Sequence, residues 1–93
     1  MGSDGVREIL GRKRTREILD YLSSGDVRNY SEIEDELDTS TDTIIRSLDI
    51  LINHGLVTRN EVSKKDVRYR ITQRGERFLE VTGTLEAILS EDN

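Results

Sequence analysis

The sequence contains no cysteine, proline or tryptophan, and aromatic side chains make up only 4% of its 93 residues. Without cysteine the chain can form neither a disulfide framework nor a thiolate metal site. No apolar run is long enough to cross a bilayer, and none follows the N-terminus as a secretory signal would. We therefore expect a cytoplasmic protein, with no membrane partner, whose small core consists mainly of isoleucine, leucine and valine.

Residues that support catalysis are also scarce. The chain has a single histidine, His54, and no glycine-rich loop for phosphate groups. His54 stands beside a glycine at the expected end of a helix, where a partly charged imidazole is favourable to the helix dipole. We expect no enzymatic activity, no metal site and no cofactor.

The net charge of −5 is unevenly distributed along the chain. Residues 59–77 carry seven basic side chains against three acidic ones, and a second basic group consists of Arg12, Lys13, Arg14 and Arg16. The rest of the chain is strongly acidic. The whole sequence is rich in arginine and poor in lysine, a composition similar to that of proteins from salt-loving archaea. A local basic surface can attract a polyanion even when the total charge is negative.

Residues 40–54 predict a capped amphipathic helix. Ser40 can serve as the N-cap, since its hydroxyl can accept a hydrogen bond from a free backbone N–H group. Gly55 is placed to end the helix in the left-handed conformation, with Leu56 folding back on its last turn. An apolar stripe recurs at helical spacing: Ile44, Leu48 and Leu51.

Two further helices are expected before this one. The first covers Val6–Ser23, with Gly11 as a weak point. The second covers Glu32–Leu37 and is opened by a capping box of Ser31 and Glu34.

After helix 40–54, two strands at Leu56–Val62 and Val67–Thr72 flank the polar connection Ser63–Asp66. In the second strand, apolar side chains alternate with two arginines, so one face packs inward and the other is basic. Thr72 can cap a last helix from Gln73 to about Ser90. The pattern predicts a mainly α fold with a three-helix core, a two-stranded β hairpin and a C-terminal helix. Its expected divisions are a disordered N-terminus at 1–5, a domain at 6–72 and the C-terminal helix at 73–93.

This order, together with LDTSTDTIIRSLDILINHGLV at residues 37–57 and YRITQRGERFLE at residues 69–80, resembles the winged helix-turn-helix regulators of the ArsR, MarR and PadR type. The resemblance extends over residues 15–89 and includes small archaeal winged-helix proteins that dimerise through a C-terminal helix. It implies a transcriptional regulator of double-stranded DNA, with helix 40–54 in the major groove and the hairpin, or wing, on the backbone or minor groove.

The resemblance also implies which residues contact DNA. Ser40 would approach a phosphate, and the base edges would be contacted by Thr41, Asp42, Thr43 and Arg46. The basic residues of the wing are Lys64, Lys65, Arg68 and Arg70. The basic group at residues 12–16 could add phosphate contacts if the first helix lies close enough.

An alternative is a winged-helix module for protein–protein interaction without sequence-specific DNA binding. Asp42 and Asp49 place negative charge on the presumed reading face, and Ile45 and Ile50 lie beside that face as a possible docking edge. The basic wing favours DNA, because so many cations on one hairpin are hard to explain in a chain otherwise so acidic.

The last helix has a seven-residue apolar spacing that suits a helix–helix contact. The residues expected at a homodimer interface are Phe78, Val81, Leu85, Ile88 and Leu89. Val6, Ile9 and Leu10 could assist. A symmetric partner would cover these side chains, although the helix could instead fold back over its own domain. The sequence identifies no small effector.

Overall fold

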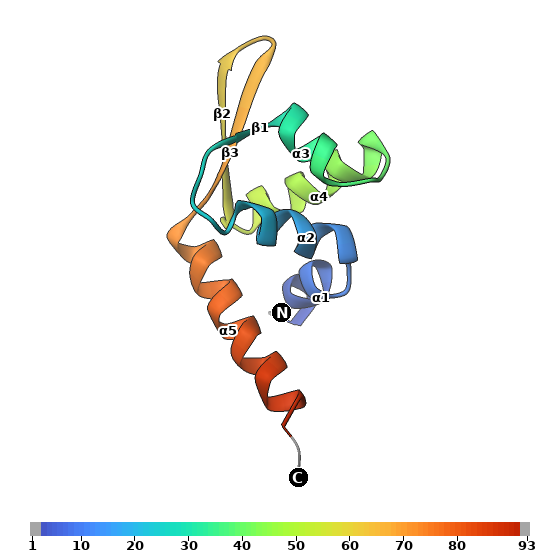
Figure 1. The fold of residues 1–93 in the computed structure, drawn as a ribbon, viewed down its shortest axis with the longest axis vertical. Coiled ribbons are helices and arrows are strands. Elements are labelled where there is room, and N and C mark those ends of the chain that lie inside the picture. Colours follow the sequence, from blue (N-terminus) through green and yellow to red (C-terminus); the bar gives the residue numbers. More distant parts are fainter. Residues whose placement is uncertain (1–2, 92–93) are drawn as a thin grey trace.

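Residues 3–91 are described by a computed structural model. The elements in chain order are α1 (Ser3–Leu10), α2 (Lys13–Leu22), β1 (Arg28–Asn29), α3 (Tyr30–Glu36), α4 (Thr41–Asn53), β2 (Val57–Ser63), β3 (Asp66–Ile71) and α5 (Gln73–Leu89). The helices α1 to α4 form a central body, from which the β2–β3 hairpin extends at one end and α5 at the other (Figure 1). The molecule is therefore elongated, with extents of 52 × 27 × 25 Å.

The core lies where α2, α3 and α4 meet the inner end of the hairpin. Apart from Tyr69, its buried apolar side chains are aliphatic, as the composition predicts. They are Ile9, Ile18, Leu19, Leu22, Ile33, Leu37, Ile44, Leu48, Leu51, Leu56, Val57, Tyr69 and Ile71. This single cluster fixes α4 against α2 and leaves the opposite side of α4 exposed.

Helix α4 is confirmed at both ends. The Thr43 amide donates to the Ser40 hydroxyl at 3.2 Å. At the other end Gly55 has a φ of 75°, and the Leu56 amide donates to the Leu51 carbonyl at 2.9 Å. These bonds satisfy backbone groups that a helix leaves unpaired at its termini.

The prediction of one helix over Val6–Ser23 is wrong, because the chain breaks between α1 and α2. The Gly11 amide still donates to the Arg7 carbonyl at 2.8 Å, but Arg12 is extended, with φ −118° and ψ 109°. Glycine is a poor helix former, and the break lets α1 turn Ile9 into the core. Helix α1 begins at Ser3, so residues 3–5 are helical rather than irregular, and residues 1–2 lie outside the described part.

The capping box of the next helix is also misplaced in the prediction. Helix α3 is capped by Asn29, whose side-chain oxygen accepts from the Glu32 amide at 2.9 Å. The Glu32 carboxylate in turn accepts from the Asn29 amide at 3.0 Å. Asparagine caps helices as well as serine does, and Glu32 stands three residues after Asn29, as a capping box requires. Asn29 is the last extended residue before α3, which decides between it and Ser31 as the cap.

The sheet has three antiparallel strands rather than two, in the order β1-β3-β2. The additional strand β1 pairs Arg28 with Tyr69. Strands β2 and β3 are joined by the two-residue turn Lys64–Lys65, which is tighter than the predicted connection. Tyr69 and Ile71 are buried while Arg68 and Arg70 face outward, so the predicted alternation is confirmed.

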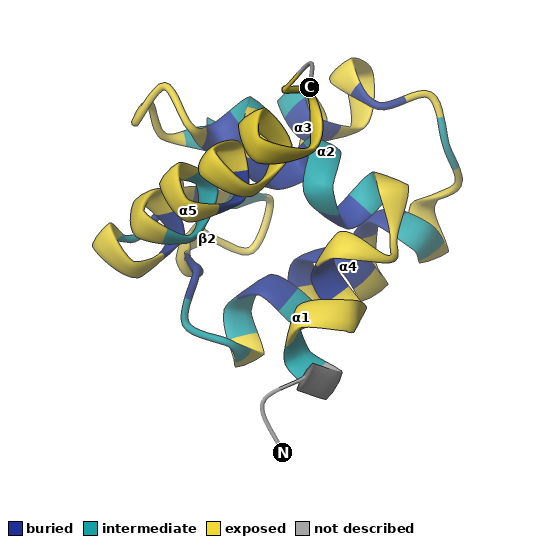
Figure 2. Cartoon of the chain, turned by 90° about the horizontal axis from the view of Figure 1, so that it is seen from below, coloured by how far each residue is buried: buried dark blue, intermediate teal, exposed yellow. Residues whose placement is uncertain are grey.

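Helix α5 begins as predicted but is little covered by its own domain. The Thr72 hydroxyl accepts from the Gly75 amide at 3.0 Å and donates to the Gly55 carbonyl at 2.7 Å. Beyond this anchor, Val81, Leu85 and the following apolar residues are exposed, as the yellow α5 of Figure 2 shows. The predicted alternative, in which α5 covers this stripe by folding back, is not observed. Within residues 3–91, no helix combines the length and apolar character needed to cross a membrane.

Candidate nucleic-acid interface

The exposed side of α4 carries the polar residues that sequence reasoning selected. Thr41, Asp42 and Arg46 are exposed, and Thr43 is partly buried. The hydroxyls of Ser40 and Thr43 lie 2.9 Å apart, and the Thr41 hydroxyl donates to the Glu34 carboxylate at 3.3 Å. The structure therefore brings these residues together on the first turns of α4, with Ser40 already engaged as the helix cap.

Arg46 is the basic residue of this surface. Its guanidinium makes no ion pair within residues 3–91, although Asp42 and Asp49 stand one turn away on either side. Asp42 also lies in the first turn of α4, where a carboxylate is favourable to the helix dipole. Arg46 is thus available to form two parallel hydrogen bonds with an external acceptor.

The hairpin carries two kinds of basic residue. Arg68 is paired with Asp66 at 2.9 Å, and this hydrogen bond raises the pKa of the Arg68 guanidinium. Lys64 and Lys65 are exposed in the turn and make no ion pair in the described part of the chain; the same holds for Arg70. The tip of the hairpin therefore presents its two lysines as uncompensated charges, whereas much of the charge of Arg68 is offset by Asp66.

A third basic segment, at the start of α2, lies beside α4. The sequence alone did not determine this placement. The break before α2 places its first residues next to the N-terminal half of α4, around a hollow of about 280 Å³. The hollow is lined by Arg12, Lys13, Arg14, Asp42, Thr43, Arg46 and Ser47. Residues 12–14 thus lie beside α4, and their contact with DNA phosphates stays a prediction. Gly11, directly before the basic run, was the one available signal of this placement.

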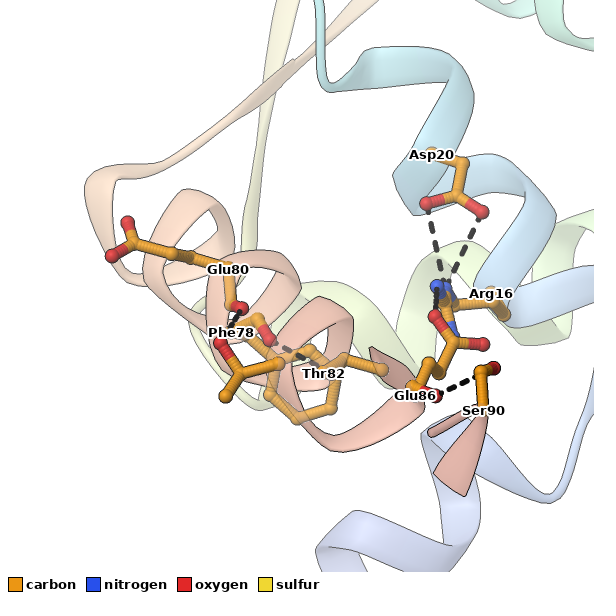
Figure 3. A network of polar contacts seen from close by, with 8 residues as sticks. Arg16, Asp20, Phe78, Glu80, Thr82, Glu86 and Ser90 are labelled. Atoms are coloured by element: carbon orange, nitrogen blue, oxygen red, sulfur yellow. Dashed lines mark hydrogen bonds and ion pairs between the residues drawn. The ribbon is translucent and has the colours of Figure 1, made fainter. Parts of the chain in front are cut away.

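Arg16 does not belong to this group. Its guanidinium donates to Glu86 of α5 at 2.9 Å and pairs with Asp20 at 3.3 Å (Figure 3). The hydrogen bond to Glu86 raises the pKa of Arg16 above its ordinary value. Arg16 therefore links α2 to α5 and does not line the hollow with Arg12, Lys13 and Arg14.

A comparison with known protein families identifies the family to which this fold belongs. The model of the winged helix-turn-helix family matches residues 13–90. The chain belongs to the winged helix-turn-helix family. The predicted fold, with α3 and α4 as the helix-turn-helix and β2–β3 as the wing, is confirmed. No curated protein matches the chain.

Solved structures with the same fold include bacterial and archaeal proteins. A protein of Porphyromonas gingivalis W83 assigned to the MarR family of transcriptional regulators superposes with a TM-score of 0.77 at 20% identity, covering 99% of this chain and 92% of that chain. The reduced transcriptional regulator YodB of B. subtilis has a TM-score of 0.77 at 20% identity, with coverages of 90% and 84%. RosR of H. salinarum has a TM-score of 0.69 at 29% identity, with coverages of 85% and 74%.

The winged helix has a second prominent surface, on the side of α1 and α5. A groove of about 550 Å³ runs between these helices and is lined largely by apolar residues. They include Val6, Ile9, Leu10, Phe78, Val81 and Leu85. His54, at the edge of this groove, lies 2.9 Å from the Glu8 carboxylate. Within residues 3–91, no three histidine or carboxylate side chains gather as a metal ion would require.

Proposed function

We propose that this winged helix protein is a transcriptional regulator that inserts α4 into the major groove of double-stranded DNA and places its wing on the flanking backbone or minor groove. The observation that carries the proposal is the distribution of uncompensated positive charge. Arg46 on α4 and the Lys64–Lys65 turn of the wing lack carboxylate partners in the described residues of a chain with a net charge of −5. The acidic remainder would repel DNA in other orientations.

The residues of α4 supply the means to discriminate between sequences. Arg46 can donate two hydrogen bonds to a guanine edge, and Asp42 can accept one from a cytosine amino group. Thr41 and Thr43 can contact base edges or phosphates, while Ser40 orients the first turn as its cap. No step of this function requires bond-breaking chemistry, and we expect the protein to meet its DNA target in the cytoplasm.

The wing supplies affinity that is independent of sequence. Lys64 and Lys65 would displace counterions from backbone phosphates, which makes binding weaken as salt is added. Arg70 adds an exposed charge on the same hairpin, and Arg68 contributes to the extent that it separates from Asp66. The interaction-module alternative is less well supported, because Ile45 is half-exposed and Ile50 partly buried, which leaves only a narrow apolar edge.

We further propose that the protein is a homodimer through α5. Four of the five residues expected at this interface are between 49% and 86% exposed in the monomer. They continue into the apolar groove that α1 forms with α5, so a second copy would bury one connected apolar surface. Two copies related by a two-fold axis would present two α4 helices to a roughly palindromic site.

Replacing Lys64 and Lys65 by glutamine should weaken binding to all duplex sequences. The slope of log K against log salt should fall by about 0.9 for each phosphate that the variant no longer neutralises. Asp66→Asn provides a control of opposite sign, since it removes a carboxylate and releases Arg68; it should strengthen binding. Fluorescence anisotropy with labelled duplexes at several salt concentrations measures both. Unchanged affinity in the lysine variant would contradict the proposed contact of the wing with DNA and, together with no enrichment of any duplex sequence by the wild-type protein, would favour the protein-interaction module.

A further inference from the structure

The hollow between α2 and α4 is unusually rich in cations for a surface of this acidic protein. Four of its lining residues are basic, and Asp42 is the one acidic residue among them. The charge of Arg14 is offset by an ion pair with Glu17 at 2.8 Å. Arg12 and Lys13 are exposed and make no ion pair among the described residues, like Arg46 across the hollow. Like charges gathered at one place repel, and an anion between them relieves that repulsion.

The local fold directs this charge toward the hollow. Arg12 is the N-cap of α2, yet no side chain caps this helix, and its first turn carries no acidic residue. The first backbone N–H groups of α2 therefore add a positive dipole end to the same region as the basic side chains. The basic side chains define the site, and the helix end adds to their field.

The position of the hollow relative to the wing identifies its partner. Asp42, Thr43 and Arg46 border the hollow on one side of α4. The other side of α4, at Ile45 and Asp49, faces the wing residue Arg59 across a separate depression. The exposed edge of α4 thus projects between α2 and the wing. A helix in the major groove lies between two phosphate backbones, so each flank of α4 faces one of them.

We infer that Arg12 and Lys13, on the α2 side of the hollow, bind a backbone phosphate of duplex DNA on the side of α4 opposite the wing, while Arg46 on the α4 side contacts the base edges. The inference rests on the proposed function and extends it to a second anchor. The wing holds the backbone on one edge of the major groove and the start of α2 holds the backbone on the other edge. Because the contact is to phosphate, it contributes affinity and orientation but no sequence preference.

The double variant Arg12→Gln/Lys13→Gln tests this inference. Both side chains are exposed, so the variant should fold, which circular dichroism and thermal unfolding can verify. Its affinity should fall equally for a preferred and an unrelated duplex, and the salt slope should fall by about 0.9 for each phosphate left without its cation. Arg7→Gln is the matched control, because Arg7 is exposed on α1 and does not line the hollow. It should leave the slope unchanged.

A second measurement locates the phosphate. Single phosphates of the preferred duplex are replaced by uncharged methylphosphonates, one position at a time. At the phosphate that fits the hollow, the wild-type protein should lose affinity while the Arg12/Lys13 variant should not. The Lys64/Lys65 variant should retain the wild-type sensitivity at that position.

The outcomes separate this inference from the function on which it rests. If the Arg12/Lys13 variant keeps the full affinity and salt slope while the wing variant loses them, the hollow is not a phosphate site and the proposed function stands. If the double variant still responds to the same methylphosphonate as the wild type, the inference is likewise overturned. If the wild-type protein binds no duplex DNA, both fail.

Discussion

Replacing Leu85 with glutamate is expected to convert a dimer into a monomer and to lower affinity for a two-half-site duplex by roughly 100-fold or more. Leu85 is 49% exposed in the single chain and lines the apolar groove between α1 and α5. In a symmetric dimer the substitution would place two unpaired carboxylates in an apolar contact, which is costly. Each released monomer would then bind one half-site without the gain from simultaneous engagement.

Ala87→Glu is the matched control for this prediction. Ala87 is also exposed on α5 and lies about 200° around the helix from Leu85. It should leave both dimer mass and DNA affinity close to those of the wild-type protein. Light scattering at micromolar to high micromolar concentrations gives the mass directly. A monomeric mass of the wild-type protein over this range would contradict the proposed homodimer.

Gly75→Ala should produce the largest loss of folding stability among the glycine substitutions in α5. Gly75 is buried, and a Cβ atom there would collide with the carbonyl oxygen of Leu56 and lie 2.7 Å from Ile71 Cγ1. That carbonyl cannot easily move, because it accepts a hydrogen bond from the Thr72 amide at 2.9 Å. The free energy of unfolding should fall by about 1–3 kcal/mol, toward the upper end because the obstacle is backbone.

Gly83→Ala provides the comparison within the same helix. Nothing lies within 4 Å of a Cβ atom built at Gly83, so alanine should raise the free energy of unfolding by about 0.5–1 kcal/mol through its higher helix propensity. Urea unfolding of both variants measures the two changes. Equal effects of the two substitutions would contradict the close packing of α5 on Leu56.

Local signals in the sequence were sufficient to predict both ends of α4, the helix proposed to contact the bases. Ser40 and Gly55 each determine one end of α4 through hydrogen bonds within a few residues, so neither depends on the rest of the fold. Thr72 did the same for the start of α5. At α3 the predicted cap, Ser31, was wrong, and Asn29, which pairs with Arg68 of β3, caps the helix instead. That pairing is a tertiary contact.

The missed features all depend on contacts between distant segments. Strand β1 has two residues and therefore shows no periodicity; its existence depends on Tyr69, far along the chain. The break at Gly11 could be recognised as a weak point, but the direction taken by α1 depends on where Ile9 packs. The hollow at α2 and the link from Arg16 to Glu86 follow from those placements. The composition showed that residues 12–16 were basic, and only the fold separated Arg16 from its neighbours.

The central claim is that α4 reads DNA sequence, and selection of bound duplexes from a random library tests it most directly. The wild-type protein should enrich a reproducible, roughly palindromic motif. Arg46→Ala, in the same selection, should relax discrimination at one position of each half-site and cost about 1–3 kcal/mol on the preferred sequence. No enrichment by the wild-type protein, at salt concentrations low enough for it to bind DNA, would contradict sequence recognition by α4.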